Sequence, residues 1–275
     1  MAKETLVDDS NGVGIGFVWP PIGFCSRIRT CTIYLYPFLS DRLQQTDAVV
    51  DYFDGLANSW NRNYASSPHF KARLQVIQIM LRDARKGTAL DLGCGSGYIS
   101  LMLAGLGYDV FGVDVSSRMI DQARSIFEKR NQVGQFAVGD ATNLKLASNF
   151  FDVVTCMSVL EWIEDIGKSI QEIARVMKPG GILIVSVPNK QSLPRKIEWA
   201  LHKLKNKSRS LKKGYLLHQK HQFYPDEFDR LLSNHGMFRE DGKYFVAPLG
   251  QFFPNNLLAK SKNWGMMYCG RYRKD

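Results

Sequence analysis

Residues 89–97 are Ala-Leu-Asp-Leu-Gly-Cys-Gly-Ser-Gly, and this stretch decides the fold class. The apolar run Thr88–Leu92 predicts a short buried strand. The three glycines that follow predict a sharp turn, because glycine adopts positive φ freely and lets the backbone approach a ligand closely. A helix to about Leu106 is predicted next. The unit therefore indicates a parallel strand whose carboxyl end holds a ligand, as in α/β folds.

Strands and helices continue to alternate along the chain. Further buried-type runs predict strands at Asp109–Val113, Gln135–Val138, Phe151–Met157 and Ile182–Val187. The segments between them predict helices at Ser116–Arg130, where Ser116 can cap the first turn, and at Gly167–Met177. This alternation is typical of βαβ units and a parallel sheet. The remaining predicted elements are a helix at Pro225–His235 and closing strands at Phe238–Val246 and Trp264–Tyr272.

Two regions precede this core. Residues 1–40 are rich in Gly, Pro and Thr and show no periodicity, so we expect an irregular arm with partial strand around Thr32–Tyr36. Residues 41–86 have helical periodicity and predict a helical cap that belongs to a main domain of residues 41–275. The uncharged residues 11–26 include two prolines and are too few for a membrane-spanning helix.

The charge of the chain is concentrated in one segment. The 275 residues carry a formal charge of +10, and nine of the 36 basic residues lie between Lys190 and Lys213, opposed only by Glu198. We therefore expect a basic insertion at residues 190–222, with an amphipathic helix over Leu193–Leu211. Such a helix could lie on an anionic membrane, close as a lid over an acidic or lipid-soluble acceptor, contact RNA phosphates, or stay a solvated lid with no partner.

Acidic residues end three of the predicted strands, namely Asp91, Asp114 and Asp140. Parallel strands would bring all three to one rim. An acid after the second strand suits ribose hydroxyls, whereas three carboxylates disfavour a pyrophosphate and favour a cationic nucleoside such as a sulfonium. Tyr98 replaces the last glycine of G-x-G-x-x-G, and the loop lacks the lysine of a P-loop. The alternative role for these acids is helix capping or turn formation.

Five motifs in order resemble the class I S-adenosylmethionine-dependent methyltransferases, over roughly residues 45–250. The matching segments are Leu90–Gly97, Gly112–Asp114, Gly139–Ala141, Phe151–Val154 and Val176–Gly181. The resemblance implies an α/β fold: a Rossmann-like, doubly wound sheet of seven strands, mostly parallel with the last strand antiparallel. It also implies S-adenosylmethionine as cofactor and S-adenosylhomocysteine as product.

The resemblance further implies roles for single residues. The glycine loop would lie under the methionine part of the cofactor, and Asp114 would bind the ribose. Asp140 would lie near the adenine amine and Asp91 near the amino group. The expected cofactor-binding set is Asp91, Gly93, Cys94, Gly95, Gly97, Asp114, Val115, Asp140, Ala141, Met157 and Tyr64.

The acceptor side of the site has fewer signals. Related quinone-biosynthesis enzymes carry Glu-x-x-Glu-His after the fourth strand, linked to a metal, but residues 158–162 here are Ser-Val-Leu-Glu-Trp, so we expect no metal. Glu161 remains as a candidate base or acceptor contact, or a solvated helix-start residue. His218 and His221 precede the helix at Pro225, and histidine is the natural base near neutral pH. The candidate catalytic residues are therefore His221, His218 and Glu161.

The sequence thus predicts methyl transfer to an oxygen, or less favourably a nitrogen, of a small molecule by in-line displacement. Methylation of RNA or protein is an alternative, although nucleic acid is disfavoured because no RNA-binding module is recognisable. A protein that binds the cofactor but acts only in assembly or regulation is another. Five cysteines without metal-ligand spacing indicate a reducing cytoplasm. The basic residues 190–213 leave peripheral contact with an anionic membrane open. The oligomeric state stays open.

Overall fold

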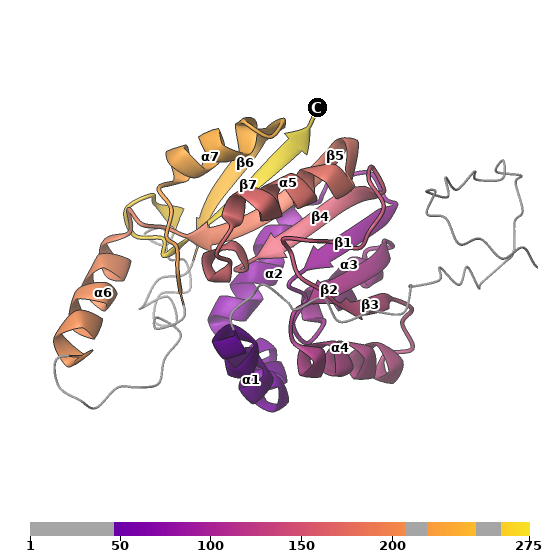
Figure 1. Cartoon of the computed structure of the whole chain (residues 1–275), viewed down its shortest axis with the longest axis horizontal. Helices are drawn as coiled ribbons and strands as arrows, with labels where there is room; N and C mark the ends of the chain where they lie inside the picture. Colours follow the sequence, from indigo (N-terminus) through magenta and orange to yellow (C-terminus); the bar gives the residue numbers. More distant parts are fainter. Residues whose placement is uncertain (1–46, 207–218, 246–259) are drawn as a thin grey trace, which may run out of the picture. The chain divides into compact units, whose positions relative to one another are not determined.

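The computed structural model describes residues 47–206, 219–245 and 260–275 (Figure 1). All of them belong to one compact unit, Arg42–Asp275. Its elements in chain order are α1 (Asp47–Ser66), α2 (Pro68–Met80), β1 (Thr88–Leu92), α3 (Tyr98–Gly105), β2 (Asp109–Asp114), α4 (Ser117–Lys129), β3 (Gln135–Val138), β4 (Phe151–Met157), the 3₁₀ turn η1 (Leu160–Trp162), α5 (Ile166–Val176), β5 (Met177–Pro188), α6 (Leu193–Asn206), α7 (Pro225–Ser233), β6 (Met237–Phe245) and β7 (Met267–Lys274).

Seven strands of the described residues form one sheet in the order β3-β2-β1-β4-β5-β7-β6. The first five pair in parallel, and β7 lies between β5 and β6, antiparallel to both. The predicted seven-stranded sheet with an antiparallel last strand is therefore confirmed. The order reverses at β1, which pairs with β2 on one side and β4 on the other. Ligands of open α/β sheets bind at such a reversal, outside the carboxyl ends of the strands.

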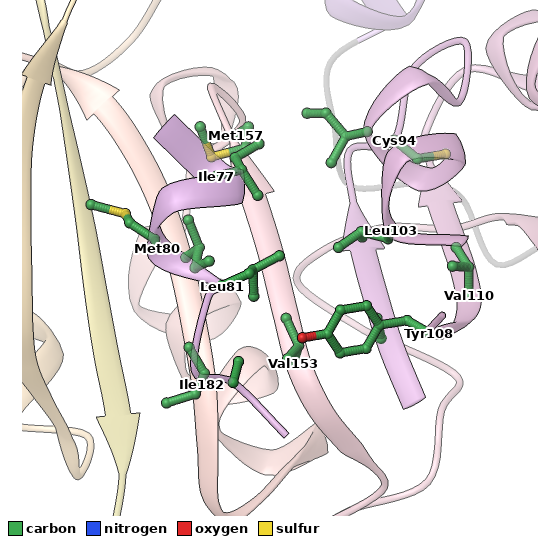
Figure 2. Close-up of a cluster of buried hydrophobic side chains, with 14 of the residues drawn as sticks. Ile77, Met80, Leu81, Cys94, Leu103, Tyr108, Val110, Val153, Met157 and Ile182 are labelled. Carbon is green, nitrogen blue, oxygen red and sulfur yellow. The ribbon is translucent and has the colours of Figure 1, made fainter. Parts of the chain in front are cut away.

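One face of the sheet is covered by α2, α3 and α4. Side chains alternate along a strand, so Ala89 and Val153 point to this face while Leu90 and Val154 point to the other. Figure 2 shows Ile77 and Met80 of α2, and Leu81 directly after it, packed on this face. Leu103 of α3 and Val153 of β4 belong to the same cluster. These side chains are almost fully buried, which makes this packing a main source of stability.

The opposite face is covered by α5 and α7. Ile170, Ile173 and Val176 recur on one side of α5 and are fully buried against the strands, and Phe228 and Leu232 do the same from α7. The side chain of Asp165 caps α5 by accepting from the Lys168 amide at 3.0 Å. The central strands β1 and β4 are thus buried on both faces, which leaves their carboxyl ends for contact with ligands.

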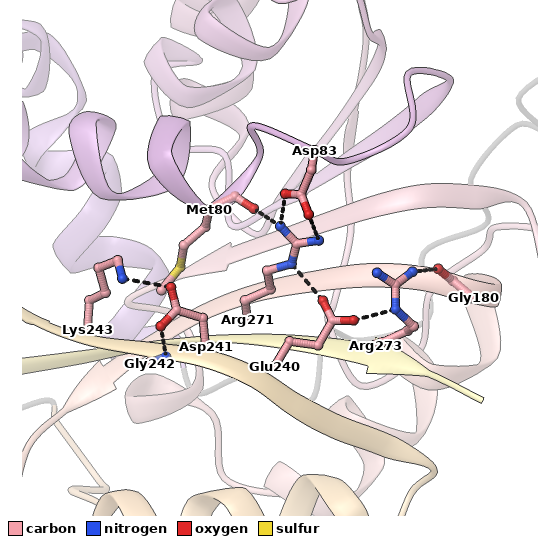
Figure 3. Close-up of polar contacts among 9 residues, drawn as sticks. All are labelled: Met80, Asp83, Gly180, Glu240, Asp241, Gly242, Lys243, Arg271 and Arg273. Atoms are coloured by element: carbon pink, nitrogen blue, oxygen red, sulfur yellow. Dashed lines mark hydrogen bonds and ion pairs between the residues drawn. The ribbon is translucent and has the colours of Figure 1, made fainter.

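A polar network fixes the end of α2 to the antiparallel strand. Figure 3 shows Arg271 of β7 donating to the Met80 carbonyl at 2.5 Å and to Asp83 at 2.6 Å, while its Nε donates to Glu240 of β6 at 2.8 Å. Arg271 is buried, so these acceptors satisfy a guanidinium that would otherwise be costly to desolvate. The network holds α2, which carries Arg73, against the sheet.

Most predicted elements are confirmed within one to three residues, including the Ser116 cap, whose Oγ accepts from the Met119 amide at 3.0 Å. β5 begins at Met177, five residues before the predicted start, because the turn before it already pairs with Phe151. The predicted arm 1–40 lies outside the described residues, as does the end of the Leu193–Leu211 helix beyond Asn206. Within the described ranges, the helices are too short or too polar to cross a membrane.

Candidate active site

The glycine loop lies between β1 and α3, where sequence analysis placed it. Gly93, Gly95 and Gly97 have φ angles of +70°, +51° and +83°, which residues with a Cβ rarely adopt. The amides of Gly93 and Cys94 both donate to the Val113 carbonyl, at 2.7 and 3.1 Å. The loop is therefore tied to β2, and its backbone takes a shape that needs glycine.

Asp114 organises this loop through both of its carboxyl oxygens. Oδ2 accepts from the Gly95 amide at 2.8 Å, and Oδ1 accepts from the Ser116 amide at 2.9 Å. Burial raises the pKa of Asp114, and the two amides oppose that shift by stabilising the carboxylate. The acid after β2 thus lies beside the glycine loop with its orientation set by the backbone.

The other two acids of the rim differ in their surroundings. Asp91 is 1% exposed and accepts from Ser100 at 2.6 Å and from Thr155 at 2.9 Å, so each of its oxygens has a partner. Burial raises the pKa of Asp91 to about 6. Asp140 is also buried and accepts from the Thr142 amide at 2.8 Å. Both acids therefore have structural partners, compatible with the turn-forming alternative as well as with ligand contact.

Helix α1 contributes aromatic and polar groups next to the loop. The indole of Trp60 lies over Gly95, where an added Cβ would come within 3.4 Å of Nε1. Asp54 accepts from the Ser116 hydroxyl at 2.5 Å, which links α1 to the start of α4. Tyr52 stacks on Trp162 of η1, with ring centroids 6.1 Å apart. The side chain of Tyr64, also on α1, is outside the described part of the structure.

The remaining predicted cofactor contacts are close to the loop. Figure 2 shows Cys94 and Met157 at the edge of the hydrophobic cluster, near the carboxyl ends of β1 and β4. Burial raises the pKa of the Cys94 thiol well above its ordinary value, so this cysteine is an apolar wall and not a nucleophile. Val115 follows Asp114 directly, and Ala141 is buried behind Asp140.

A second group of polar residues follows β4. Glu161 of η1 is 4% exposed, and its Oε2 is buried without a hydrogen-bond partner. Burial raises the pKa of Glu161 to about 7, although Arg73, Arg195 and the Ser158 hydroxyl favour its ionised form. A solvated helix-start role for Glu161 is therefore wrong. A buried carboxyl with a free oxygen and a pKa near neutrality has the properties of a general base.

The backbone at His221 is hydrogen-bonded to the backbone at Glu161. The amides of Lys220 and His221 donate to the Glu161 carbonyl at 2.8 and 3.2 Å, and Nε2 of His221 is buried without a hydrogen-bond partner. The structure thus brings together two of the three catalytic candidates from distant parts of the sequence. The third, His218, lies outside the described residues.

The two groups of residues meet through Val159. A Cβ on Gly93 would lie 2.2 Å from Cγ2 of Val159, so the segment before η1 packs directly on the glycine loop. Ser158, with φ +60°, begins this segment and accepts from Arg73 of α2 at 3.0 Å. We call the loop with Asp91, Asp114 and Asp140 the cofactor half, and Glu161, Gln219, His221, Arg73 and Arg195 the acceptor half.

Sequence analysis did not mark Arg73 or Arg195. Arg73 lies in an ordinary helical pattern, and Arg195 lies among nine basic residues that look alike in the sequence. Only the fold separates them, since Arg195 is 5% exposed while its neighbour Lys196 is exposed. Burial among other polar groups is a tertiary property that the local pattern does not carry.

The residues of the cofactor half fit S-adenosylmethionine. The glycine loop provides a backbone surface without side chains, Asp114 provides an oriented carboxylate for hydroxyl groups, and nearby carboxylates suit a sulfonium and an ammonium group. In the described ranges, no three or more His, Cys, Asp or Glu side chains gather to hold a metal ion.

Comparisons with known proteins agree with this geometry. A family model described as a methyltransferase domain matches residues 90–185. The ubiquinone biosynthesis O-methyltransferase of Thiobacillus denitrificans (strain ATCC 25259 / T1) is 32% identical over 152 residues, which are 53% of this chain and 64% of that protein. The chain covers less than two thirds of the length of the curated relatives that it matches first.

Solved structures show the same fold. The magnesium protoporphyrin IX methyltransferase of Synechocystis PCC 6803, solved with bound SAH, gives a TM-score of 0.62 at 18% identity over 83% of this chain and 99% of that one. A possible histamine N-methyltransferase of Thermotoga maritima gives a TM-score of 0.60 at 22% identity over 82% and 99%.

Proposed function

We propose that the chain is a class I S-adenosylmethionine-dependent methyltransferase, as its similarity to a methyltransferase domain and to O-methyltransferases supports, and that it transfers the methyl group of this cofactor to an oxygen of a small-molecule acceptor. The observation that carries the proposal is the direct contact between the glycine loop and the segment that leads to Glu161. This contact supports the proposal, because Val159 is two residues before Glu161, a buried carboxyl with a free oxygen.

When bound, S-adenosylmethionine supplies an electrophilic methyl on a positively charged sulfur. We assign its binding to the cofactor half, with Asp114 on the ribose, Asp140 towards the adenine and Asp91 towards the amino group. Trp60 would cover the loop and exclude water from it. Positioning of the two reactants supplies much of the catalysis in such a transfer, since the reaction is an in-line displacement.

Glu161 is the proposed base. An acceptor hydroxyl must lose its proton as the new carbon–oxygen bond forms and the carbon–sulfur bond breaks, and the unpartnered Oε2 of Glu161 can take it. His221 is the second candidate for this role, because its buried Nε2 is also without a partner. A hydroxyl needs a base during the transfer, whereas an amine that is neutral near pH 7 can attack without one. The proposed base therefore favours an oxygen acceptor over such a nitrogen.

We also propose that α6 rests on an anionic membrane surface. Leu193, Ile197 and Leu201 recur every four residues on one face of this helix and are 46%, 59% and 51% exposed. Lys190 and Lys196 in the described part of the basic segment 190–213 are exposed as well. Exposed apolar and basic residues together are the combination that binds amphipathic helices to anionic lipid. Figure 1 shows α6 extending away from the sheet, beyond the end of β5.

The alternatives differ in what they methylate or in whether they turn over. RNA or protein methylation would use the same basic segment, and a regulatory protein would bind the cofactor without transfer. Transfer from radiolabelled S-adenosylmethionine to phenols, carboxylic acids, amines, total RNA and protein separates these outcomes. Label in small phenols or hydroxy acids supports the proposal. Label in RNA or protein alone, or no label despite cofactor binding, would favour an alternative.

A further inference from the structure

Two arginines of the acceptor half, the buried Arg195 and the half-buried Arg73, have hydrogen-bond donors without acceptors. Nε of Arg73 and Nη1 of Arg195 are both inaccessible to solvent and make no hydrogen bond. Other atoms of the same side chains do form hydrogen bonds, since Arg73 donates from Nη2 to Ser158 at 3.0 Å and Arg195 donates from Nε to the Met266 carbonyl at 3.0 Å. The side chains are therefore held in place while one donor on each stays unused.

The fold brings both arginines close enough to Glu161 to favour its charged form. Ser158, which Arg73 contacts, follows β4, and Met266, which Arg195 contacts, precedes β7. β4, β5 and β7 are neighbours, with Met157 opposite Ser186 and Pro188 opposite Met267. Both guanidinium groups act electrostatically on Glu161. The unused donors thus lie over the same edge of the sheet as the proposed base.

The acidic side chains near these two guanidinium groups neutralise their charge only in part. Glu198 is the nearest acidic partner of Arg195, but its oxygen is 3.9 Å from Nη1, and its side chain is 31% exposed. Burial keeps Glu161 partly protonated near neutral pH, so it balances the two arginines incompletely. A buried donor without an acceptor is costly, and a bound anion that accepts from it removes that cost.

We propose that the acceptor carries a carboxylate group, which Arg73 and Arg195 bind while its hydroxyl faces Glu161. A guanidinium matches a planar carboxylate in geometry. A monoanion suits two donors next to an acidic residue, whereas a phosphate dianion would be repelled by Glu161 and Glu198. This inference rests on the proposed function and names the substrate class of the same site.

The test compares carboxylates with their amides on protein saturated with S-adenosylhomocysteine. The probes are 4-hydroxybenzoate, 4-hydroxycinnamate and a long-chain hydroxy acid, each paired with its neutral amide. The first readout is the shift in melting temperature of the saturated protein, and the second is methyl transfer by protein supplied with S-adenosylmethionine and no S-adenosylhomocysteine. We expect at least one carboxylate to be preferred over its amide by about tenfold or more, the size of a charged hydrogen bond.

Arg73→Met should bring that preference close to one while leaving the affinity for S-adenosylhomocysteine unchanged. Lys71→Met is the matched control, because Lys71 is an exposed cation on the same helix. Arg73→Lys keeps the charge but removes the Nε donor, and it is the second variant if Arg73→Met folds poorly. It should also lose most of the preference for the carboxylate over its amide.

Three results would overturn the inference: equal response to acid and amide, a preference that survives in both Arg73 variants, or no response to any member of the panel by protein that binds S-adenosylhomocysteine. Failure to bind S-adenosylhomocysteine at all would instead contradict the proposed function, so the two failures are distinguishable.

Discussion

The cofactor half and the acceptor half of this site differ in how their buried polar groups are satisfied. In the cofactor half, Asp91 and Asp114 each have a protein donor on both oxygens, and Ser96 Oγ is the exception without one. In the acceptor half, Arg73, Glu161, Arg195, Gln219 and His221 each keep a buried polar atom without a hydrogen-bond partner. Buried polar atoms are rarely left unpaired.

This difference has a physical consequence. The cofactor half is already organised by the protein, as suits a ligand that is the same in every turnover. The acceptor half carries unmet hydrogen bonds, so a ligand with complementary groups gains both its own interactions and relief of the desolvation cost. A buried site with unpaired polar groups is therefore selective for the acceptor that pairs them.

Glu161→Gln gives the largest expected effect, and it should impair the acceptor half without affecting the cofactor half. Turnover should fall by about 10²- to 10⁴-fold, the usual contribution of a general base, with unchanged affinity for S-adenosylhomocysteine. Since the base must be ionised, wild-type turnover should rise with pH through about 7, and the variant should lose this rise. Initial rates from pH 5.5 to 9 check both statements. A variant with wild-type turnover would remove Glu161 as the base.

Asp114→Ala should break the cofactor half. It removes the acceptor of the Gly95 amide in the loop and of the Ser116 amide before α4, together with the proposed ribose contact. Affinity for S-adenosylhomocysteine should therefore fall by roughly 100-fold or more. Asp109→Ala is the control, because Asp109 is an exposed acid on the same strand. Isothermal titration gives both affinities, and circular dichroism shows whether the fold is intact. Wild-type affinity in a folded variant would contradict the assignment.

Glu161 should also make stability depend on pH. Its pKa is raised from 4.5 to about 7 on folding, so the folded state binds this proton more tightly than the unfolded chain. Stability is therefore fully present below about pH 4.5 and falls as pH rises to about 7, by about 3 kcal/mol. Urea unfolding at pH 5 and pH 8 should show a smaller loss in Glu161→Gln. Equal losses in the two proteins would mean that Glu161 is not buried.

Gly93→Ala tests the contact that joins the halves. Its Cβ would overlap Val159 and its φ is positive, so we expect a loss of about 2 kcal/mol in stability. Gly107→Ala shares the positive φ but meets no atom within 4 Å, and it should cost about half as much. Val159→Ala should recover part of the Gly93→Ala loss in a double-mutant cycle. Additive losses would show that the two halves do not touch there.

The smallest effect concerns α6. The double substitution Ile197→Ser and Leu201→Ser should lower binding to vesicles of phosphatidylglycerol and phosphatidylcholine by roughly tenfold, because it removes exposed apolar contacts. Val133→Ser is the control, since Val133 is 88% exposed but lies between α4 and β3. Cosedimentation measures both. Wild-type protein that fails to bind these vesicles would exclude the membrane proposal.

The cofactor half could be predicted from sequence far better than the acceptor half. Strand β1, its glycine turn and the acids after β1, β2 and β3 are local patterns, and parallel pairing brings them together. The acceptor half is assembled from α2, η1, the start of α6 and residues 219–221, which no local pattern connects. Glu161 was found from its place after β4, but its burial and its arginine neighbours needed the fold.

The central claim is that the cofactor half is preformed and separable from the acceptor half. Calorimetric titration of the protein with S-adenosylhomocysteine, repeated with Glu161→Gln, tests it most directly. We predict micromolar binding to the wild type and the same affinity for Glu161→Gln. Folded wild-type protein that shows no binding, or a Glu161→Gln variant that loses it, would contradict the claim.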